Sequence, residues 1–189
     1  HIIMGRFFNF FLALIISLII VAPSLIIASL VKITSKGPTL FWSKRMGINN
    51  KTFLMPKFRT MKQNTPDVAT HLLREPGQFI TPIGLFLRRS SLDEIPQVYS
   101  VLLGHMSLVG PRPALFNQYD LISLRDKKGV SKLKPGITGW AQVNGRDELS
   151  IPDKVQFDEE YLRRASLGFD IYIIWLTIIK AIKKDGISH

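Results

Sequence analysis

An uninterrupted apolar run dominates the first part of the chain. From Phe7 to Val31 the sequence contains no charged side chain and is dense in Ile, Leu and Phe. At about 1.5 Å per residue, a helix of this length reaches across a hydrocarbon layer about 30 Å thick, which is more than the core of a small soluble domain requires. The run is also long for a signal peptide, and no small-residue cleavage site follows it. The sequence therefore predicts a membrane segment.

A proline and an uneven distribution of charge shape this segment. Pro23 has no N–H to donate to the carbonyl of Ile19, so a kink is expected. Two arrangements stay open: the helix spans the membrane, or it bends at Pro23 and returns with both ends on one side. Few cations precede the run and several follow it, which places the body on the cytoplasmic side. These cations are Arg6 before the run and Lys32, Lys36, Lys44 and Arg45 after it.

The rest of the chain is basic and lacks cysteine. Lys and Arg number 25 against 14 Asp and Glu, for a net charge of +11, which predicts an anionic partner such as nucleic acid, an acidic membrane or a phosphorylated substrate. The absence of Cys excludes disulfides and thiolate metal sites, and the four scattered His residues do not form a metal-binding motif. The length of 189 residues suits one catalytic domain behind the anchor.

Two adjacent carboxylates, Asp93 and Glu94, stand where a helix is expected to begin. Ser91 and Glu94 have the spacing of a capping box, and Pro96 is tolerated only within a first turn. The helix is therefore expected to start at Leu92 or Asp93. The positive end of its dipole favours the ionised form of both carboxylates.

Neighbouring carboxylates suit phosphoryl transfer better than glycoside hydrolysis, which needs two groups on opposite sides of a bond. One carboxylate can attack phosphorus while the other binds Mg²⁺ together with substrate phosphates. Lys57 and Arg59 project from one face of an extended segment, and Arg112 is held between two prolines, so these cations suit a diphosphate. The predicted clamps are Lys57, Arg59, Arg88, Arg112 and Arg146. The alternatives are a solvated edge strand and a proline-rich connector.

Two segments predict strands. Residues 40–43 and 52–55 flank the turn-rich stretch 47–50 and indicate a hairpin. Residues 137–143 alternate like a strand, and Asn144-Gly145 predicts a tight turn after it. In that strand Gln142 and Asn144 would share a face with Trp140, where they could hold a nucleobase; the alternative is a Trp in the core.

Several further helices are expected along the basic body. The segment 79–89 is apolar with Arg88 and Arg89 at its end, which fits either a core helix or a segment on the lipid interface. The helix after Asp93 is expected to stop near Gly104. A helix and a basic turn are expected within 114–134. The segment 169–184 is too short to span a bilayer and is predicted to rest on the membrane or to pack on the anchor.

Four stretches that carry these residues resemble one known family, the monotopic phosphoglycosyl transferases, or bacterial sugar transferases. They are KFRTM at 57–61, SLDEIPQ at 91–97, MSLVGPRP at 106–113 and KPGITGWAQVNGR at 134–146. All four follow in order, and the resemblance as a whole extends over nearly the entire chain. This combination is far more specific than any one of the signals above.

The resemblance implies a transferase that moves a sugar phosphate from a UDP-sugar to undecaprenyl phosphate, releases UMP, and uses Mg²⁺ and a covalent aspartyl intermediate. Asp93 corresponds to the nucleophile and, with Glu94, to the metal site. The closest likeness is to members that use UDP-N,N′-diacetylbacillosamine. The family's anchor is a re-entrant helix broken at a proline, which corresponds to Pro23. A membrane enzyme of this kind has no use for nucleic acid; the rival interpretation is a non-catalytic basic module on anionic lipid.

The resemblance also implies an architecture. The expected fold is α+β and mostly helical, with a re-entrant anchor at 1–36 and a catalytic domain at 37–189 that carries small antiparallel strand elements and interfacial amphipathic helices. The expected location is the cytoplasmic face of a bacterial inner membrane. Two positions depart from the pattern of many members: Asn9 stands in place of Asp, and Ala22 in place of Ser. Both bear on how the anchor is held.

Overall fold

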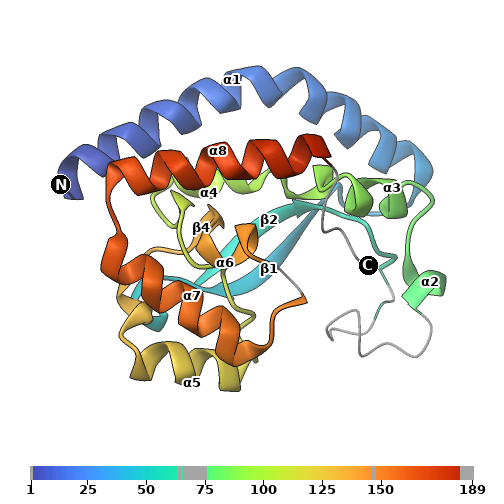
Figure 1. Ribbon diagram of the computed structural model, residues 1–189. Coiled ribbons are helices and arrows are strands. Elements are labelled where there is room, and N and C mark those ends of the chain that lie inside the picture. The colour runs from blue at the N-terminus through green and yellow to red at the C-terminus, as the bar shows by residue number, and fades with distance from the viewer. Residues whose placement is uncertain (1, 64, 66–75, 146–147, 184–189) are drawn as a thin grey trace.

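A long curved helix lies across one side of the molecule. The computed structural model describes residues 2–63, 65, 76–145 and 148–183. Helix α1 (Ile2–Thr34) continues through Pro23 and arches over the body (Figure 1). Its segment Phe7–Thr34 is long and apolar enough to cross a membrane, and only 11% of its most apolar window is buried. The interruption expected at Pro23 therefore takes the form of curvature in one continuous helix.

The predicted hairpin is confirmed. Strand β1 (Leu40–Met46) pairs antiparallel with β2 (Thr52–Phe58) around the 3₁₀ turn η1 (Ile48–Asn50). Ser43 lies opposite Met55, and both are buried. Residues directly opposite each other share a face of the sheet, so one face of the hairpin points into the body.

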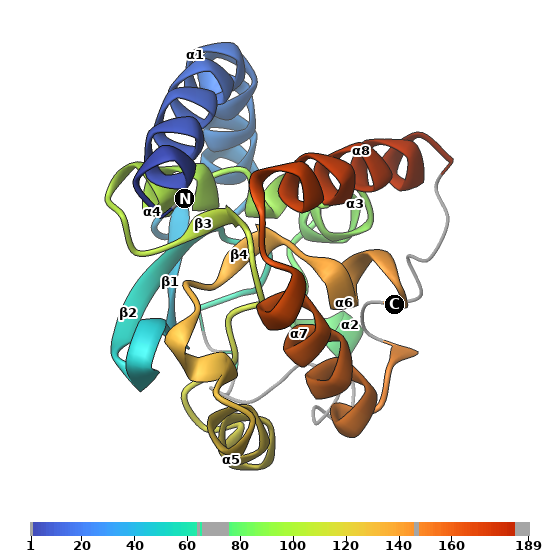
Figure 2. The ribbon, with the colours of Figure 1, turned by 60° about the vertical axis from the view of Figure 1, so that its left-hand side comes forward.

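Three short or amphipathic helices form a layer beneath α1. Figures 1 and 2 show α3 (Gly84–Arg89), α4 (Gln97–Leu102) and α8 (Leu167–Lys183) on the side of the body that carries α1, and in Figure 2 α1 lies over α4 while α8 extends away from it. The helices expected at 79–89 and after Asp93 are thus present, although the first is divided between α2 (Pro76–Phe79) and α3. The 3₁₀ helix η3 (Leu92–Glu94) connects α3 to α4.

The second sheet is small and parallel. Strand β3 (Ser107–Val109) pairs with β4 (Gly136–Thr138), with Ser107 opposite Gly136. The expectation of only antiparallel strand elements is therefore wrong for this pair. The intervening residues fold into α5 (Tyr119–Lys127) and the 3₁₀ helix η4 (Val130–Lys132), which agrees with the helix and basic turn predicted for 114–134.

The predicted strand at 137–143 is wrong after residue 138. Its last part is helix α6 (Trp140–Val143), followed by a turn at Asn144 and Gly145. Alternation of apolar residues misled the prediction because a helix of one turn is too short to show its own periodicity. Helix α7 (Ile151–Arg164) comes next and is capped by Ser150, whose Oγ accepts a hydrogen bond from the Asp153 N–H.

The core joins α1 to the body. Its main cluster contains Ala13 of α1, Val98 of α4, Val109 of β3 and Ile173 of α8. A second cluster joins Val31, near the other end of α1, to Leu87 of α3. The amphipathic helix expected at 169–184 is α8, whose Ile173 belongs to the same cluster as Ala13 of α1, while Trp175 and Ile178 are each 54% exposed.

Candidate active site

The carboxylate pair lies on a tight reversal between α3 and α4. The backbone of Ser91 is left-handed, with φ 56° and ψ 17°, and its side chain makes no capping hydrogen bond. The predicted capping box is therefore absent, because Ser91 turns the chain instead of capping a helix. The Glu94 N–H donates to the carbonyl of Ser91, and Pro96 precedes the first turn of α4. A left-handed serine costs roughly 1–2 kcal/mol and is held here by its surroundings.

Two cations from distant segments bind Glu94. Lys57 Nζ of β2 donates to Glu94 Oε1 at 2.8 Å, and Arg112 Nη2 donates to the same oxygen at 2.9 Å. Burial by itself opposes ionisation of Glu94. The charges of Arg112 and Lys57 and their hydrogen bonds outweigh burial and hold the pKa of this carboxyl well below its usual range. Glu94 is therefore ionised at neutral pH, as the sequence predicted.

Asp93 has the opposite environment. Its side chain is buried, and burial together with the charge of Glu94 raises its pKa, although Lys57 and Arg88 act in the opposite direction. The expected stabilisation by a helix dipole is outweighed because η3 is a single 3₁₀ turn. The two neighbouring carboxylates thus differ in basicity, and Asp93 is the more basic of the two.

Arg88 and Arg59 occupy different places. Arg88 Nε donates to Thr60 Oγ1 at 2.9 Å, and its charge acts on Asp93. Arg59 is buried at 5% exposure, and its guanidinium donates to the carbonyls of Pro38 and Ser35 near the end of α1. The structure therefore brings Lys57, Arg88 and Arg112 to the carboxylates and places Arg59 at the C-terminal end of the anchor helix.

Arg45 also belongs to the site, although it was not predicted from the sequence as a site residue. It lies on β1, opposite Phe53 and on the same face of the hairpin as Lys57. Burial and the charge of Arg112 lower the pKa of Arg45 to about 10, while Glu94 acts in the opposite direction. The alternation of β1 could have revealed it, because Arg45 follows the inward-facing Ser43 by two residues.

Gln142 and Asn144 do not form the polar face beside Trp140 that was predicted to hold a nucleobase. Both amide atoms of Gln142 are buried and have no hydrogen-bond partner within the described residues, and Asn144 Nδ2 donates to the carbonyl of Trp140. The Trp140 indole donates to Glu160 Oε2 and packs against Phe169. Trp140 thus has the core role that was the alternative. Arg146 lies outside the described residues.

The carboxylates fit a magnesium ion by ligand chemistry. Mg²⁺ takes hard oxygen ligands and is commonly held by one or two carboxylates together with substrate phosphates. Both charged hydrogen bonds of Glu94 go to Oε1, so they leave Oε2 as an acceptor. In the described part of the chain no group of three or more His, Cys, Asp or Glu side chains could hold a metal. A site that relies on substrate oxygens agrees with this donor set.

The site is thus a largely buried carboxylate pair surrounded by cations, in a protein whose long N-terminal helix is apolar and mostly exposed. The chain belongs to the bacterial sugar transferase family, which it matches over residues 1–184.

Curated relatives extend this comparison. The chain is 43% identical over 172 residues to the UDP-glucose:undecaprenyl-phosphate glucose-1-phosphate transferase of Escherichia coli, which covers 86% of this chain and 37% of the relative. It is 35% identical over 187 residues to the undecaprenyl-phosphate galactose phosphotransferase of Salmonella typhimurium, covering 90% and 39%. It is 37% identical over 161 residues to the uncharacterized sugar transferase EpsL of Bacillus subtilis, covering 85% and 78%. The chain thus spans less than half the length of the first two relatives.

Proposed function

We propose that this chain transfers a sugar 1-phosphate from a UDP-sugar to undecaprenyl phosphate and releases UMP, as the first membrane step of glycan assembly. The names of the Escherichia coli and Salmonella typhimurium relatives support this reaction. The observation that carries the proposal is the arrangement at η3: Lys57 and Arg112 hold the Glu94 carboxylate, and the more basic Asp93 lies beside it.

In the proposed first step Asp93 is the nucleophile. A carboxylate oxygen attacks the phosphorus that carries the sugar, the new O–P bond forms, and the bridging P–O bond breaks so that its electron pair leaves with UMP. In the second step a phosphate oxygen of undecaprenyl phosphate attacks the same phosphorus and restores the Asp93 carboxylate. The raised pKa of Asp93, caused mainly by burial, suits a nucleophile because the carboxylate is more basic.

Glu94 and the surrounding cations supply charge and orientation. Mg²⁺, held by Glu94 with Asp93 beside it, would neutralise charge on the donor diphosphate. Arg112 and Lys57 contact Glu94 and are placed to bind phosphate oxygens, and Arg88 acts on Asp93. The other residues predicted from the sequence to contact phosphate or base are Arg59, Gln142, Asn144 and Arg146, and substituting each in the same assay measures its contribution.

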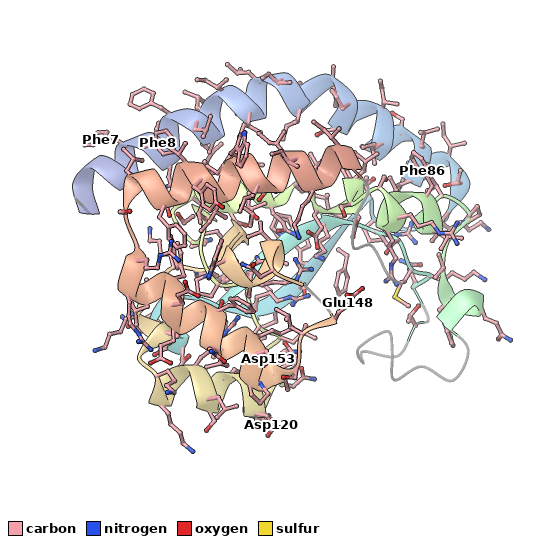
Figure 3. All side chains as sticks on the ribbon, in the orientation of Figure 1. Phe7, Phe8, Phe86, Asp120, Glu148 and Asp153 are labelled. Carbon is pink, nitrogen blue, oxygen red and sulfur yellow. The ribbon has the colours of Figure 1, made fainter. Side chains whose placement is uncertain are left out.

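The membrane-facing surface supports a lipid substrate. Apolar side chains are exposed on α1, α3, α4 and α8, which lie on one side of the molecule. In Figure 3, Phe7 and Phe86 lie on that side, whereas Asp120 and Asp153 lie at the opposite end. Exposed apolar area on the scale of four helices marks an interaction surface, and a bilayer covers it.

The re-entrant arrangement is part of the proposal. The Asn9 side chain joins the first half of α1 to β3, and a hydrogen bond from Arg59, the residue after β2, to the Ser35 carbonyl holds the chain just after α1. Both ends of the helix therefore contact one body, while Leu18 and Leu25 between them are 70% and 64% exposed. This favours a helix that enters and leaves on the cytoplasmic face of a bacterial inner membrane.

The identity of the donor sugar is the most specific part of the proposal. The resemblance to members that use UDP-N,N′-diacetylbacillosamine favours an acetamido sugar, whereas the names of the two relatives specify glucose and galactose. A panel of UDP-glucose, UDP-galactose, UDP-N-acetylglucosamine and UDP-N,N′-diacetylbacillosamine, with undecaprenyl phosphate and Mg²⁺ in lipid nanodiscs, distinguishes them by UMP release.

The decisive experiment is Asp93→Asn in that assay, with Asp120→Asn on α5 as the matched control. Asp93→Asn is expected to release no UMP and to form no phosphosugar adduct detectable by mass spectrometry, while Asp120→Asn keeps both. Full activity in Asp93→Asn removes Asp93 as the nucleophile. A purely lipid-binding basic module would bind anionic vesicles and release no UMP from any donor.

Topology has a separate test. Because the sequence contains no Cys, single cysteines introduced at Arg6 and Lys36, charged positions before and after the apolar run, can be labelled without background. In inside-out and right-side-out vesicles, labelling of both from the cytoplasmic side supports a re-entrant helix, and labelling from opposite sides contradicts it.

A further inference from the structure

Three successive backbone carbonyls around Arg112 each accept a hydrogen bond. The carbonyl of Pro111 accepts from the Gly136 N–H at 2.9 Å, that of Arg112 from Arg125 Nη1 at 2.8 Å, and that of Pro113 from Arg45 Nη1 at 3.0 Å. Both flanking residues are proline, which already restricts the backbone. This segment is therefore fixed far more closely than the contact of a surface arginine requires.

The bond from Arg125 belongs to a buried ion pair that the proposed mechanism does not use. Arg125 of α5 is 9% exposed and Asp158 of α7 is 1% exposed. Arg125 Nε and Nη2 both contact Asp158 Oδ2, at 2.9 and 2.7 Å. This leaves Nη1 directed at the Arg112 carbonyl. Asp158 thus holds the guanidinium in the orientation from which it reaches the backbone of Arg112.

The pair is poorly explained by stability alone. A buried ion pair often stabilises a fold no better than apolar residues of the same volume. In this protein a neighbouring contact, Lys128 to Glu159 at 3.2 Å, already joins the end of α5 to α7 at the surface. What distinguishes Arg125 is its third contact, which continues through one residue to the Glu94 carboxylate.

We propose that Arg125, held by Asp158, is a positioning residue that fixes Arg112 against Glu94. The inference rests on the proposed function and extends it. Arg125 touches no reacting atom. It acts through the Arg112 carbonyl, on which the direction of the Arg112 side chain depends. A displacement of about 1 Å in such a group is enough to cost about a hundredfold in rate.

A double-mutant cycle separates positioning from general stability. Arg125→Met and Arg112→Ala are made singly and together. The value of kcat/KM for UMP release from radiolabelled UDP-sugar is measured at enzyme concentrations high enough to quantify slow variants. Arg125→Met is expected to lower kcat/KM at least tenfold in the natural background and less than twofold in the Arg112→Ala background. Arg125→Lys, which keeps a cation but has one donor group, is expected to fall between Arg125→Met and the unmodified protein.

Lys128→Met is the matched control, because it removes an ion pair between the same two helices without touching the Arg112 segment. It is expected to change kcat/KM by less than twofold. Equal losses from Arg125→Met in both backgrounds, or no loss in either, overturn the positioning role. If the unmodified protein releases no UMP from any donor in the panel, the proposed function fails first and takes this inference with it.

Discussion

The side-chain oxygen of Asn9 accepts a hydrogen bond from the backbone N–H of Leu108 at 2.8 Å and another from Ser107 Oγ at 3.0 Å. This joins the first half of the anchor helix to β3, which leads through Gly110 directly to Arg112. The anchor and the candidate active site are therefore parts of one packed unit. The position of α1 therefore constrains the loop that carries Arg112.

Substitution of Asn9 tests this connection. Asn9→Leu leaves the Leu108 N–H and the Ser107 hydroxyl without their acceptor, so the free energy of unfolding is expected to fall by about 1–3 kcal/mol. Asn9→Asp keeps an oxygen in the same place and is expected to stay within about 0.5 kcal/mol of the unmodified protein. Denaturant unfolding in a fixed detergent measures both. Equal losses in the two variants would show that the acceptor oxygen is not what matters.

Arg59 and Lys57 are expected to respond differently, although the sequence places both on one strand face. Arg59→Met removes buried hydrogen bonds to Ser35 and Pro38 and is expected to lower the free energy of unfolding by about 2–4 kcal/mol, with the KM for UDP-sugar unchanged. Lys57→Met removes a partner of Glu94 and is expected to lower kcat/KM at least tenfold. The two readouts are thermal unfolding and steady-state kinetics. A rise in KM in folded Arg59→Met would return Arg59 to the substrate.

The features predicted correctly from the sequence are those with a local cause. The long apolar helix α1, the hairpin around residues 47–50 and the amphipathic helix α8 each follow from a run, a turn or a periodicity within a few neighbouring residues. Lys57 and Arg112 were predicted to clamp a diphosphate beside Asp93 and Glu94; in the structure both form ion pairs with Glu94.

The features that were missed depend on tertiary contacts. Ser91 adopts a left-handed turn that its own side chain does not stabilise, and the helix at Trp140 forms where that ring packs on Phe169. Arg59 bonds to carbonyls near the end of a helix more than twenty residues earlier in the chain. No local pattern in the sequence distinguishes such a structural arginine from one that binds phosphate.

The close approach of β4 to the loop after β3 predicts a steric effect at Gly139. A Cβ there would overlap the carbonyl oxygen of Gly110, two residues before Arg112. Gly139→Ala is expected to lower the free energy of unfolding by about 1–3 kcal/mol and to reduce kcat/KM, because the Arg112 segment must move. Gly168→Ala in α8 is the control, since nothing lies within 4 Å of its Cβ position and alanine favours helix. Similar thermal unfolding of the two variants would contradict the close contact.

Asp170 predicts how stability changes with pH. Burial raises the pKa of this carboxyl, although the Tyr161 hydroxyl, which donates to Oδ1 at 2.7 Å, acts in the opposite direction. Between the unfolded pKa and this higher folded pKa, the native state binds more protons than the unfolded state. The free energy of unfolding contributed by Asp170 therefore falls as pH rises through that interval. Asp170→Asn keeps the acceptor for Tyr161 and removes the titration. The thermal midpoint of Asp170→Asn, relative to that of the unmodified protein, is expected to rise from about pH 4 upward and then to stay at a constant difference.

Thermal midpoints measured from pH 3.5 to 8, with the exposed Asp120→Asn as control, test this expectation. A midpoint of Asp170→Asn that falls behind with rising pH would show that the folded protein favours the ionised carboxylate.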